Sequence, residues 1–242
     1  MLITTITCSN CHNAVDNNFC GNCGQPIQIK RIDKDYILHE IWHILHFDKG
    51  IFYTIKELLI RPGQNVKEFI ATNRSRLVKP VIFIIITSLI YTLTSNFFHI
   101  EKGYVNFDGS KQSAIGLIFS WVQHHYGYAN IIMGMYIAFW SKLFFSRYNY
   151  NFFEILILLC FVMGVGMLIF AAFAVIEGLT KVSLMNIAGA VAILYAIWAI
   201  GQFFDAKKVS SYFKALAAYM LGMIVFSLSL VLLGILIDFL KP

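Results

Sequence analysis

Four cysteines near the start of the chain are spaced to bind a metal ion. They form two Cys-x-x-Cys pairs, Cys8 with Cys11 and Cys20 with Cys23. Each pair can place two thiolates on one side of a tight turn, and four thiolates around one ion favour tetrahedral Zn²⁺. Iron bound by the same four sulfurs is the main alternative. The spacing therefore predicts a single four-cysteine metal site, with zinc as the preferred ion.

Two disulfides would be another use of the same cysteines. The sequence has no signal peptide before Cys8, and the distribution of basic residues predicts that this end of the chain lies in the cytosol. Thiols stay reduced in that compartment, so disulfides are disfavoured. We expect residues 1–26 to form a cytosolic zinc ribbon.

A second metal pattern, His-Glu-Ile-Trp-His, occupies residues 39–43. On a helix, His39 and His43 can share one ion, and Glu40 is the catalytic candidate because it can act as general base on a metal-bound water. Such a site needs a third ligand, for which Glu154 is the best-placed carboxylate. The simpler role of Glu154 is a negative charge at a helix N-terminus. A polar helix face explains the histidines equally simply, so the sequence favours a protein without enzymatic activity.

The composition indicates a membrane protein. Of the 242 residues, 58% are hydrophobic and 13% are charged, which is far more apolar than a soluble domain of this size. Five apolar stretches each approach the ~20 residues that cross a bilayer. They are residues 81–98, 129–145, 155–176, 184–204 and 215–240. The sequence thus predicts an all-α integral membrane domain over residues 80–242 with five transmembrane helices, and an interfacial or re-entrant piece over residues 114–122.

Residues 27–79 are predicted to form a collar of short amphipathic helices, on the inner leaflet or against the cytosolic ends of the spans. The helices are expected over residues 33–48, from Gly50 to an Arg-Pro-Gly turn at residues 61–63, and over residues 65–71. Basic residues border these helices and are expected to bind the membrane surface. They are Lys56, Arg61, Lys67, Arg74, Arg76 and Lys79.

Lysine and arginine are unevenly distributed between the two sides of the predicted spans. Ten precede the first span and five lie in loops on the same side, against four on the opposite side. This bias predicts a cytoplasmic N-terminus and an outside C-terminus. The net charge of +6 then fits anionic lipid on the cytosolic face. Nucleic acid is not an expected partner, because the basic residues alternate with lipid-facing apolar ones.

Three segments carry a resemblance to a known family. They are FCGNCGQ, the run from LHEIWHILHFDKG to IRPGQNVKEF, and NRSRLVKP, which ends at Pro80. Together they resemble a family of bacterial zinc-ribbon multipass membrane proteins of unknown function, with its His-rich segment, Asp-Lys-Gly turn and Arg-Pro-Gly turn. The resemblance implies the bacterial inner membrane and leaves the activity open. The five-span arrangement is also similar to Yip1-type membrane proteins.

The spans themselves have no charged residue near their centres and no proline, which disfavours a proton-coupled pump. The leading prediction is a non-enzymatic inner-membrane protein whose zinc ribbon and collar bind a partner protein or organise lipid. One alternative is a membrane-bound zinc hydrolase that uses the segment at residues 39–43. Another is a lipid or small-molecule transporter, since small residues such as those at 188–190 could leave a lipid-sized groove.

Overall fold

The computed structural model describes residues 6–8, 11, 13–15, 18–23, 50–72, 74, 76–100 and 113–240. The chain divides into two compact units, Met1–Phe47 and Asp48–Pro242. The helix expected over residues 33–48, with His39, Glu40 and His43, lies outside the described residues. Its metal and catalytic roles stay predictions.

A small β-hairpin organises the described part of the first unit. Strands β1 (Ile6–Thr7) and β2 (Ala14–Val15) pair antiparallel, with Ile6 opposite Val15. Beyond the strands, the N–H of Cys8 donates to the carbonyl of Asn13 at 2.9 Å. That bond closes the turn that contains the first cysteine pair, which is the local geometry that the Cys-x-x-Cys spacing requires.

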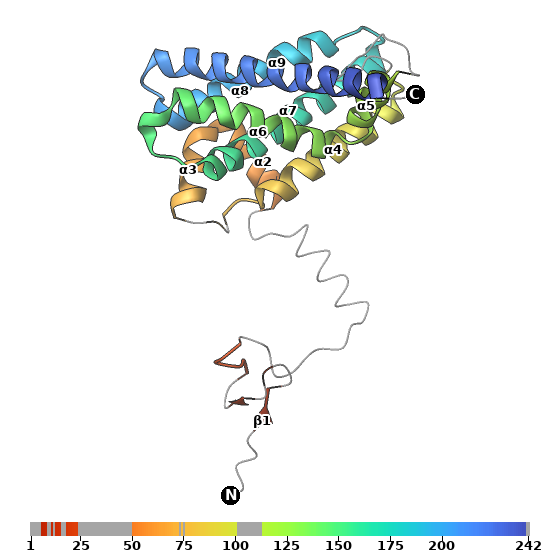
Figure 1. The fold of residues 1–242 in the computed structure, drawn as a ribbon. Coiled ribbons are helices and arrows are strands. Elements are labelled where there is room, and N and C mark those ends of the chain that lie inside the picture. The colour runs from red at the N-terminus through yellow and green to blue at the C-terminus, as the bar shows by residue number, and fades with distance from the viewer. Residues whose placement is uncertain are drawn as a thin grey trace, which may run out of the picture. The chain divides into compact units, whose positions relative to one another are not determined.

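Helices build the second unit, and Figure 1 shows the longer ones running side by side. In chain order they are α2 (Ile51–Ile60), α3 (Pro62–Ala71), α4 (Pro80–Phe97), α5 (Ala114–His124), α6 (Tyr126–Phe144), the 3₁₀ turn η1 (Ser146–Tyr148), α7 (Phe152–Thr180), α8 (Met185–Asp205) and α9 (Val209–Leu240).

Four of these helices are long and apolar enough to cross a membrane. They are α4, α7, α8 and α9, and they correspond to four of the five predicted spans. The remaining predicted span matches α6, a 19-residue helix that is not among those four. The short piece expected over residues 114–122 is α5, whose 11 residues cover about 16 Å at 1.5 Å per residue, too short to span.

Local sequence signals set several helix ends. Pro62 and Pro80 each occupy the first turn of a helix, where the missing N–H costs nothing. Helix α7 begins with a capping box: the Asn151 side chain accepts from the Glu154 N–H, and the Glu154 carboxylate accepts from the Asn151 N–H. It ends at Thr180, because the φ of 60° at the next residue, Lys181, is left-handed and cannot continue a helix.

Helix α7 is the central helix of the bundle. In the most apolar 18-residue stretch of α7, 72% of the residues are buried, whereas the value for the corresponding stretch of α9 is 17%. Helix α4 runs parallel to α7, because the Phe83 ring lies 5.7 Å from Phe161 and the Tyr91 ring lies 5.8 Å from Phe170. Farther along, Phe98 packs over Gly178. The outer faces expose large apolar side chains such as those of α9, as expected of surfaces that contact lipid.

Helix α4 begins beside the middle of α7 and not beside its start. Phe83, in the first turn of α4, contacts Phe161, which lies about 14 Å along α7 from Phe152 at 1.5 Å per residue. Helices α2 and α3, which are joined at Arg61, pack against α7 and α8. We call them the α2–α3 hairpin, which Figure 1 shows in orange beside the bundle. Both helices lie where the sequence predicts them.

Candidate functional site

The four N-terminal cysteines come together around one point. Their sulfur atoms all lie within 4.8 Å of one another. Cys8 Sγ is 3.6 Å from Cys23 Sγ, and Cys11 Sγ is 3.5 Å from Cys20 Sγ, so each short contact joins the two predicted pairs. The cluster therefore has one centre and draws two thiols from each Cys-x-x-Cys turn.

These distances fit a tetrahedral metal site. Four sulfurs at about 2.3 Å from one ion stand about 3.8 Å from one another, close to the measured separations. A disulfide would need about 2.05 Å, and all five cysteines of the chain are free thiols. Four thiolates at this spacing can hold a metal ion. The same four sulfur donors suit zinc or iron.

Local hydrogen bonds favour the ionised form of Cys11. The backbone of Asn13, the side chain of Asn22 and the Cys20 thiol all lower the pKa of Cys11, which is about 6. A thiol with this pKa is largely thiolate at neutral pH, and the thiolate is the form that binds a metal. Cys8 and Cys20 are almost completely buried, and Val15 packs against them as the main apolar neighbour.

Glu154, the proposed third ligand of the second metal site, acts in the capping box of α7. Its Oε2 accepts the Asn151 N–H at 2.8 Å, and the Glu154 N–H donates to Asn151 Oδ1 at 2.9 Å. This is the helix-terminal role that the sequence offered as the simpler one. Whether Glu154 also approaches His39 and His43 is untested, because both histidines lie outside the described residues.

Arg76 lies at the centre of a polar cluster that it forms with side chains of the α2–α3 hairpin. Its Nη2 donates to Glu57 Oε2 at 2.9 Å, its Nε donates to Tyr53 Oη at 3.0 Å, and its Nη1 donates to Glu68 Oε2. The hydrogen bond to Tyr53 raises the pKa of Arg76, and the negative charges of Glu68 and Glu57 raise it further. This predicted membrane-surface residue thus has protein partners that link α2, α3 and the chain before α4.

Three contacts fix the α2–α3 hairpin on the bundle. The Gly63 N–H donates to Gln202 Oε1 at 2.8 Å, and the Tyr195 hydroxyl donates to the Leu58 carbonyl at 3.0 Å. The rings of Phe69 and Phe161 meet edge to face at 5.4 Å. Gly63 is required at this turn, because a Cβ there would lie 2.8 Å from the Cα of Phe203.

The other predicted membrane-surface residues differ in their exposure. Lys56, Arg61, Arg74 and Lys79 are exposed. Lys67 is half-buried, with its Nζ 6.0 Å from the centre of the Phe203 ring, which is a cation–π contact. Four of the six predicted residues are therefore available to a surface, and two have partners within the bundle.

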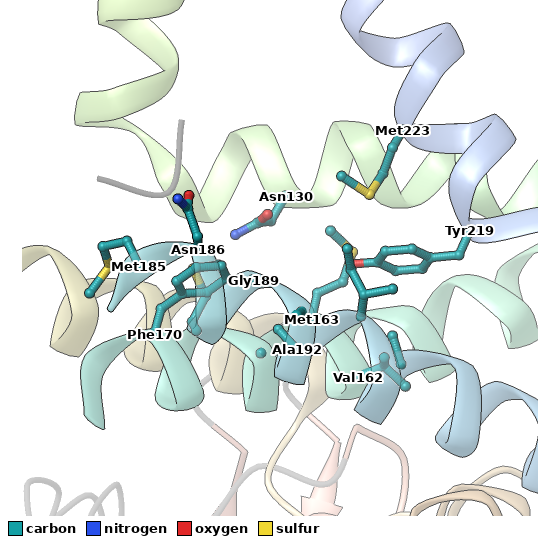
Figure 2. Close-up of a pocket in the computed structure, with 15 residues that line it drawn as sticks. Asn130, Val162, Met163, Phe170, Met185, Asn186, Gly189, Ala192, Tyr219 and Met223 are labelled. Carbon is teal, nitrogen blue, oxygen red and sulfur yellow. The ribbon is translucent and has the colours of Figure 1, made fainter. Parts of the chain in front are cut away.

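A cavity lies inside the bundle, between α6, α7, α8 and α9 (Figure 2). Its volume is about 430 Å³, and its lining includes Asn130, Met163 and Tyr219. The sequence suggested a groove from the small residues at 188–190, two of which line it. It did not single out Asn130, although an amide within a predicted span is a recognisable signal of a buried polar contact.

Comparison with known proteins gives one partial match. Residues 48–92 match the model of a family described as a protein of unknown function (DUF3667). The match covers the α2–α3 hairpin, all members of the Arg76 cluster and most of α4. No curated protein and no solved structure matches the chain.

Proposed function

We propose that the protein is a non-enzymatic membrane protein that carries a cytosolic zinc ribbon, with which it binds a partner protein. The proposal rests on the cluster formed by Cys8, Cys11, Cys20 and Cys23, whose sulfurs fit a tetrahedral ion. Zinc is preferred over iron because it is not redox-active and structural sites of this spacing commonly hold it. An exposed, metal-stabilised hairpin joined to a membrane anchor is well suited to a recognition role.

The membrane domain in this proposal has five spans, which are α6 and the four long apolar helices α4, α7, α8 and α9. Helix α6 is about 28 Å long at 1.5 Å per residue, close to the thickness of the hydrocarbon core. Ile137 packs on Gly222 of α9, and the exposed Ile132, Phe139 and Leu143 form an apolar outer face. Lys142, near the end of α6, donates to the Tyr150 carbonyl, so its charge lies at the bundle end rather than in its middle.

Basic residues support an orientation with the N-terminus inside, in a bacterial inner membrane. The ends of α6 and α8 lie together, because the Phe145 and Phe204 rings stack at 3.8 Å. Lys214 donates to the Phe144 carbonyl at the same end, and Arg147 and Lys208 belong to neighbouring turns. In this orientation the α2–α3 hairpin meets the inner leaflet, where its exposed Phe52 and Leu59 would contact acyl chains and its exposed basic side chains would contact anionic headgroups.

Metal analysis of purified protein tests the proposal. We expect one zinc per chain, no visible absorption from iron–thiolate charge transfer, and loss of the zinc in a Cys8→Ser, Cys20→Ser double variant. Cys160→Ser is the matched control, because this fifth cysteine is buried in α7 and is not part of the cluster. Zinc retained by the double variant would refute the site. Two zinc ions per chain would instead favour the hydrolase alternative.

Reporter fusions test the orientation. A fusion after Lys208 is expected to be active only in the cytosol, and one after residue 242 only when exported. If α6 does not span, both results are reversed: the fusion after Lys208 is active only when exported and the fusion after residue 242 only in the cytosol, because three spans then precede the first site and four precede the second.

A further inference from the structure

The cavity between α6, α7, α8 and α9 is open on one side and is lined mainly by apolar side chains, with a few polar groups. Figure 2 shows Asn130 of α6 between Asn186 on one side and Tyr219 on the other. The thioethers of Met163 and Met223 and the ring of Phe170 form other parts of the lining. The volume of about 430 Å³ lies within the range of small-molecule pockets, roughly 300–1,000 Å³.

Small residues create this space. A Cβ on Gly166 would first meet the Cβ of Ala192 at 4.0 Å, and a Cβ on Gly189 would first meet the Phe170 ring at 3.9 Å. Both glycines therefore leave room. Gly222 on α9 is different, because a Cβ there would lie 2.7 Å from the Cα of Ile137 and collide with it. The bundle thus uses some glycines for close helix contact and others to keep a cavity open.

Asn130 places an unsatisfied hydrogen-bond donor in the cavity. Its side chain is 1% exposed, and within the described part of the chain its Nδ2 has no hydrogen-bond partner. A buried amide in an apolar bundle is costly unless it finds an acceptor. Tyr219, which is 6% exposed, directs its ring from α9 into the same space, so its hydroxyl supplies a second polar group. The two groups together would suit a carbonyl oxygen.

The remaining lining defines the rest of a ligand. None of the described residues that line the cavity is charged, so the site favours a neutral molecule. Four methionines take part, Met163, Met167, Met185 and Met223, and their flexible thioethers adapt to rings or chains. Ala190 and Asn186 are exposed at the cavity edge, and Val191 and Leu194 of the same helix face outward. A molecule dissolved in the bilayer could therefore enter sideways past α8.

From this geometry we infer that the cavity is a binding site for a neutral, membrane-dissolved small molecule with an apolar body and a carbonyl acceptor. The carbonyl accepts from Asn130 Nδ2, and the apolar body lies against the methionines and Phe170. Two sources share this chemistry, an ester lipid such as a diacylglycerol and a quinone ring. The inference is independent of the cysteine cluster and goes beyond the proposed function.

Titration of the full-length protein in detergent with three probes tests the site. The probes are 1,2-dioctanoylglycerol, a short-chain quinone and dodecane, which lacks an acceptor, and the readout is the shift of the thermal unfolding midpoint. We expect at least one carbonyl probe to bind with saturation. Saturation by the glycerol ester alone identifies a lipid ligand, saturation by the quinone alone identifies a quinone, and saturation by both identifies a site that selects the carbonyl.

Two variants separate the cavity from the bundle surface. Gly189→Leu fills the space and is expected to weaken carbonyl-probe binding at least tenfold. Asn130→Leu removes the donor and is expected to weaken binding of the carbonyl probes by about tenfold while leaving dodecane binding unchanged. The matched controls are Val191→Leu, which adds bulk on the lipid side of α8, and Ser141→Ala, which removes another unpartnered buried group of α6 outside the cavity.

The controls should bind every probe as the unaltered protein does. The inference is overturned if no carbonyl probe saturates, because Asn130 would then be satisfied by water alone. It is also overturned if Gly189→Leu and Asn130→Leu, each folded by circular dichroism, both bind the carbonyl probes as tightly as the unaltered protein. Because the two variants alter different features, misfolding of one leaves the other as a test.

Discussion

The cysteine hairpin and the helical bundle are stabilised in different ways. In the hairpin, the described core consists of Cys8, Cys20 and Val15, with Cys11 packed against them. Three buried side chains supply far too little apolar area to offset the entropy of ordering the chain. The bundle has a long central helix, α7, that is buried over most of its length. In the proposed function, a metal ion held by the four cysteines would stabilise the hairpin, as side-chain packing stabilises the bundle.

This difference predicts that the two units respond independently to the same treatment. The stability of the hairpin should depend on metal binding and on pH, and hardly on the volume of its side chains. The stability of the bundle should depend on side-chain packing and local polar contacts, and not on metal.

Removing the metal should have the largest effect. Metal binding to four thiolates contributes about 10 kcal/mol or more to the folding of such small sites, so a strong chelator should unfold the hairpin. We expect amide exchange in residues 6–23 to become fast, while α7 and α8 keep their protection. Hydrogen exchange with mass spectrometry measures both at once. Loss of protection in α7 together with the hairpin would show that the units are coupled.

Acid should act on the same site. Protons compete with the metal for the thiolates, so metal affinity should fall as the pH falls, by more than tenfold per pH unit because more than one thiolate is protonated. Cys11, whose pKa is lowered to about 6, should stay largely ionised until the pH falls to about 6. Release of bound zinc to a chromogenic chelator, followed from pH 8 to pH 5, measures the effect. Zinc release that does not change between pH 8 and pH 5 would contradict thiolate coordination.

In the bundle, the largest effect should come from adding a methyl group where backbones touch. At Gly63 a Cβ would meet the backbone of Phe203, so Gly63→Ala should cost about 1–3 kcal/mol and loosen the α2–α3 hairpin from α8. Gly127→Ala is the matched control, because the nearest atom to its Cβ would lie at an ordinary 3.7 Å. Unfolding in a denaturing detergent measures both. Equal stability of the two variants would contradict the close contact.

Sequence patterns predicted the local structure of this bundle well. Arg61 followed by Pro62 ends one helix and begins the next, and Pro80 begins α4, since proline fixes φ and has no N–H to leave unpaired. Glu154 was expected as a negative charge at a helix N-terminus, and α7 does begin there, at Phe152. The Cys-x-x-Cys spacing likewise predicted a cluster that forms. These features depend on neighbours within a few residues, which a sequence displays directly.

Contacts between distant segments were not predictable in the same way. The bond from Gly63 to Gln202 joins residues that are far apart in the chain, and it depends on how α3 and α8 are rotated. The cavity depends on the rotation of four helices, so small residues near position 189 could equally have meant tight packing. Arg76 was assigned to the membrane surface because its charge was visible, whereas its partner Glu68 becomes apparent only when α3 folds back.

The Arg76 cluster should have an intermediate effect on bundle stability. Arg76→Met leaves Glu57 and Glu68 facing each other without a cation, and this should cost about 1–2 kcal/mol in a half-buried network. Adding Glu57→Gln and Glu68→Gln should recover most of that loss, because the like charges are then removed. Unfolding at low and high salt measures the network. No loss in Arg76→Met would show that the cluster is exposed to solvent screening, like an ordinary surface pair.

The capping box of α7 should have the smallest effect and also bears on the second metal site. Asn151→Ala removes the acceptor for the Glu154 N–H and should cost about 1 kcal/mol. Glu154→Gln keeps an acceptor for the Asn151 N–H, because glutamine also serves in a capping box, so its cost should stay below about 0.5 kcal/mol. Neither change should alter the metal content, since the capping box needs no ion. If Glu154→Gln lowers the number of metal ions per chain while Asn151→Ala does not, the carboxylate is a ligand as well as a cap, and the bundle is no longer independent of metal.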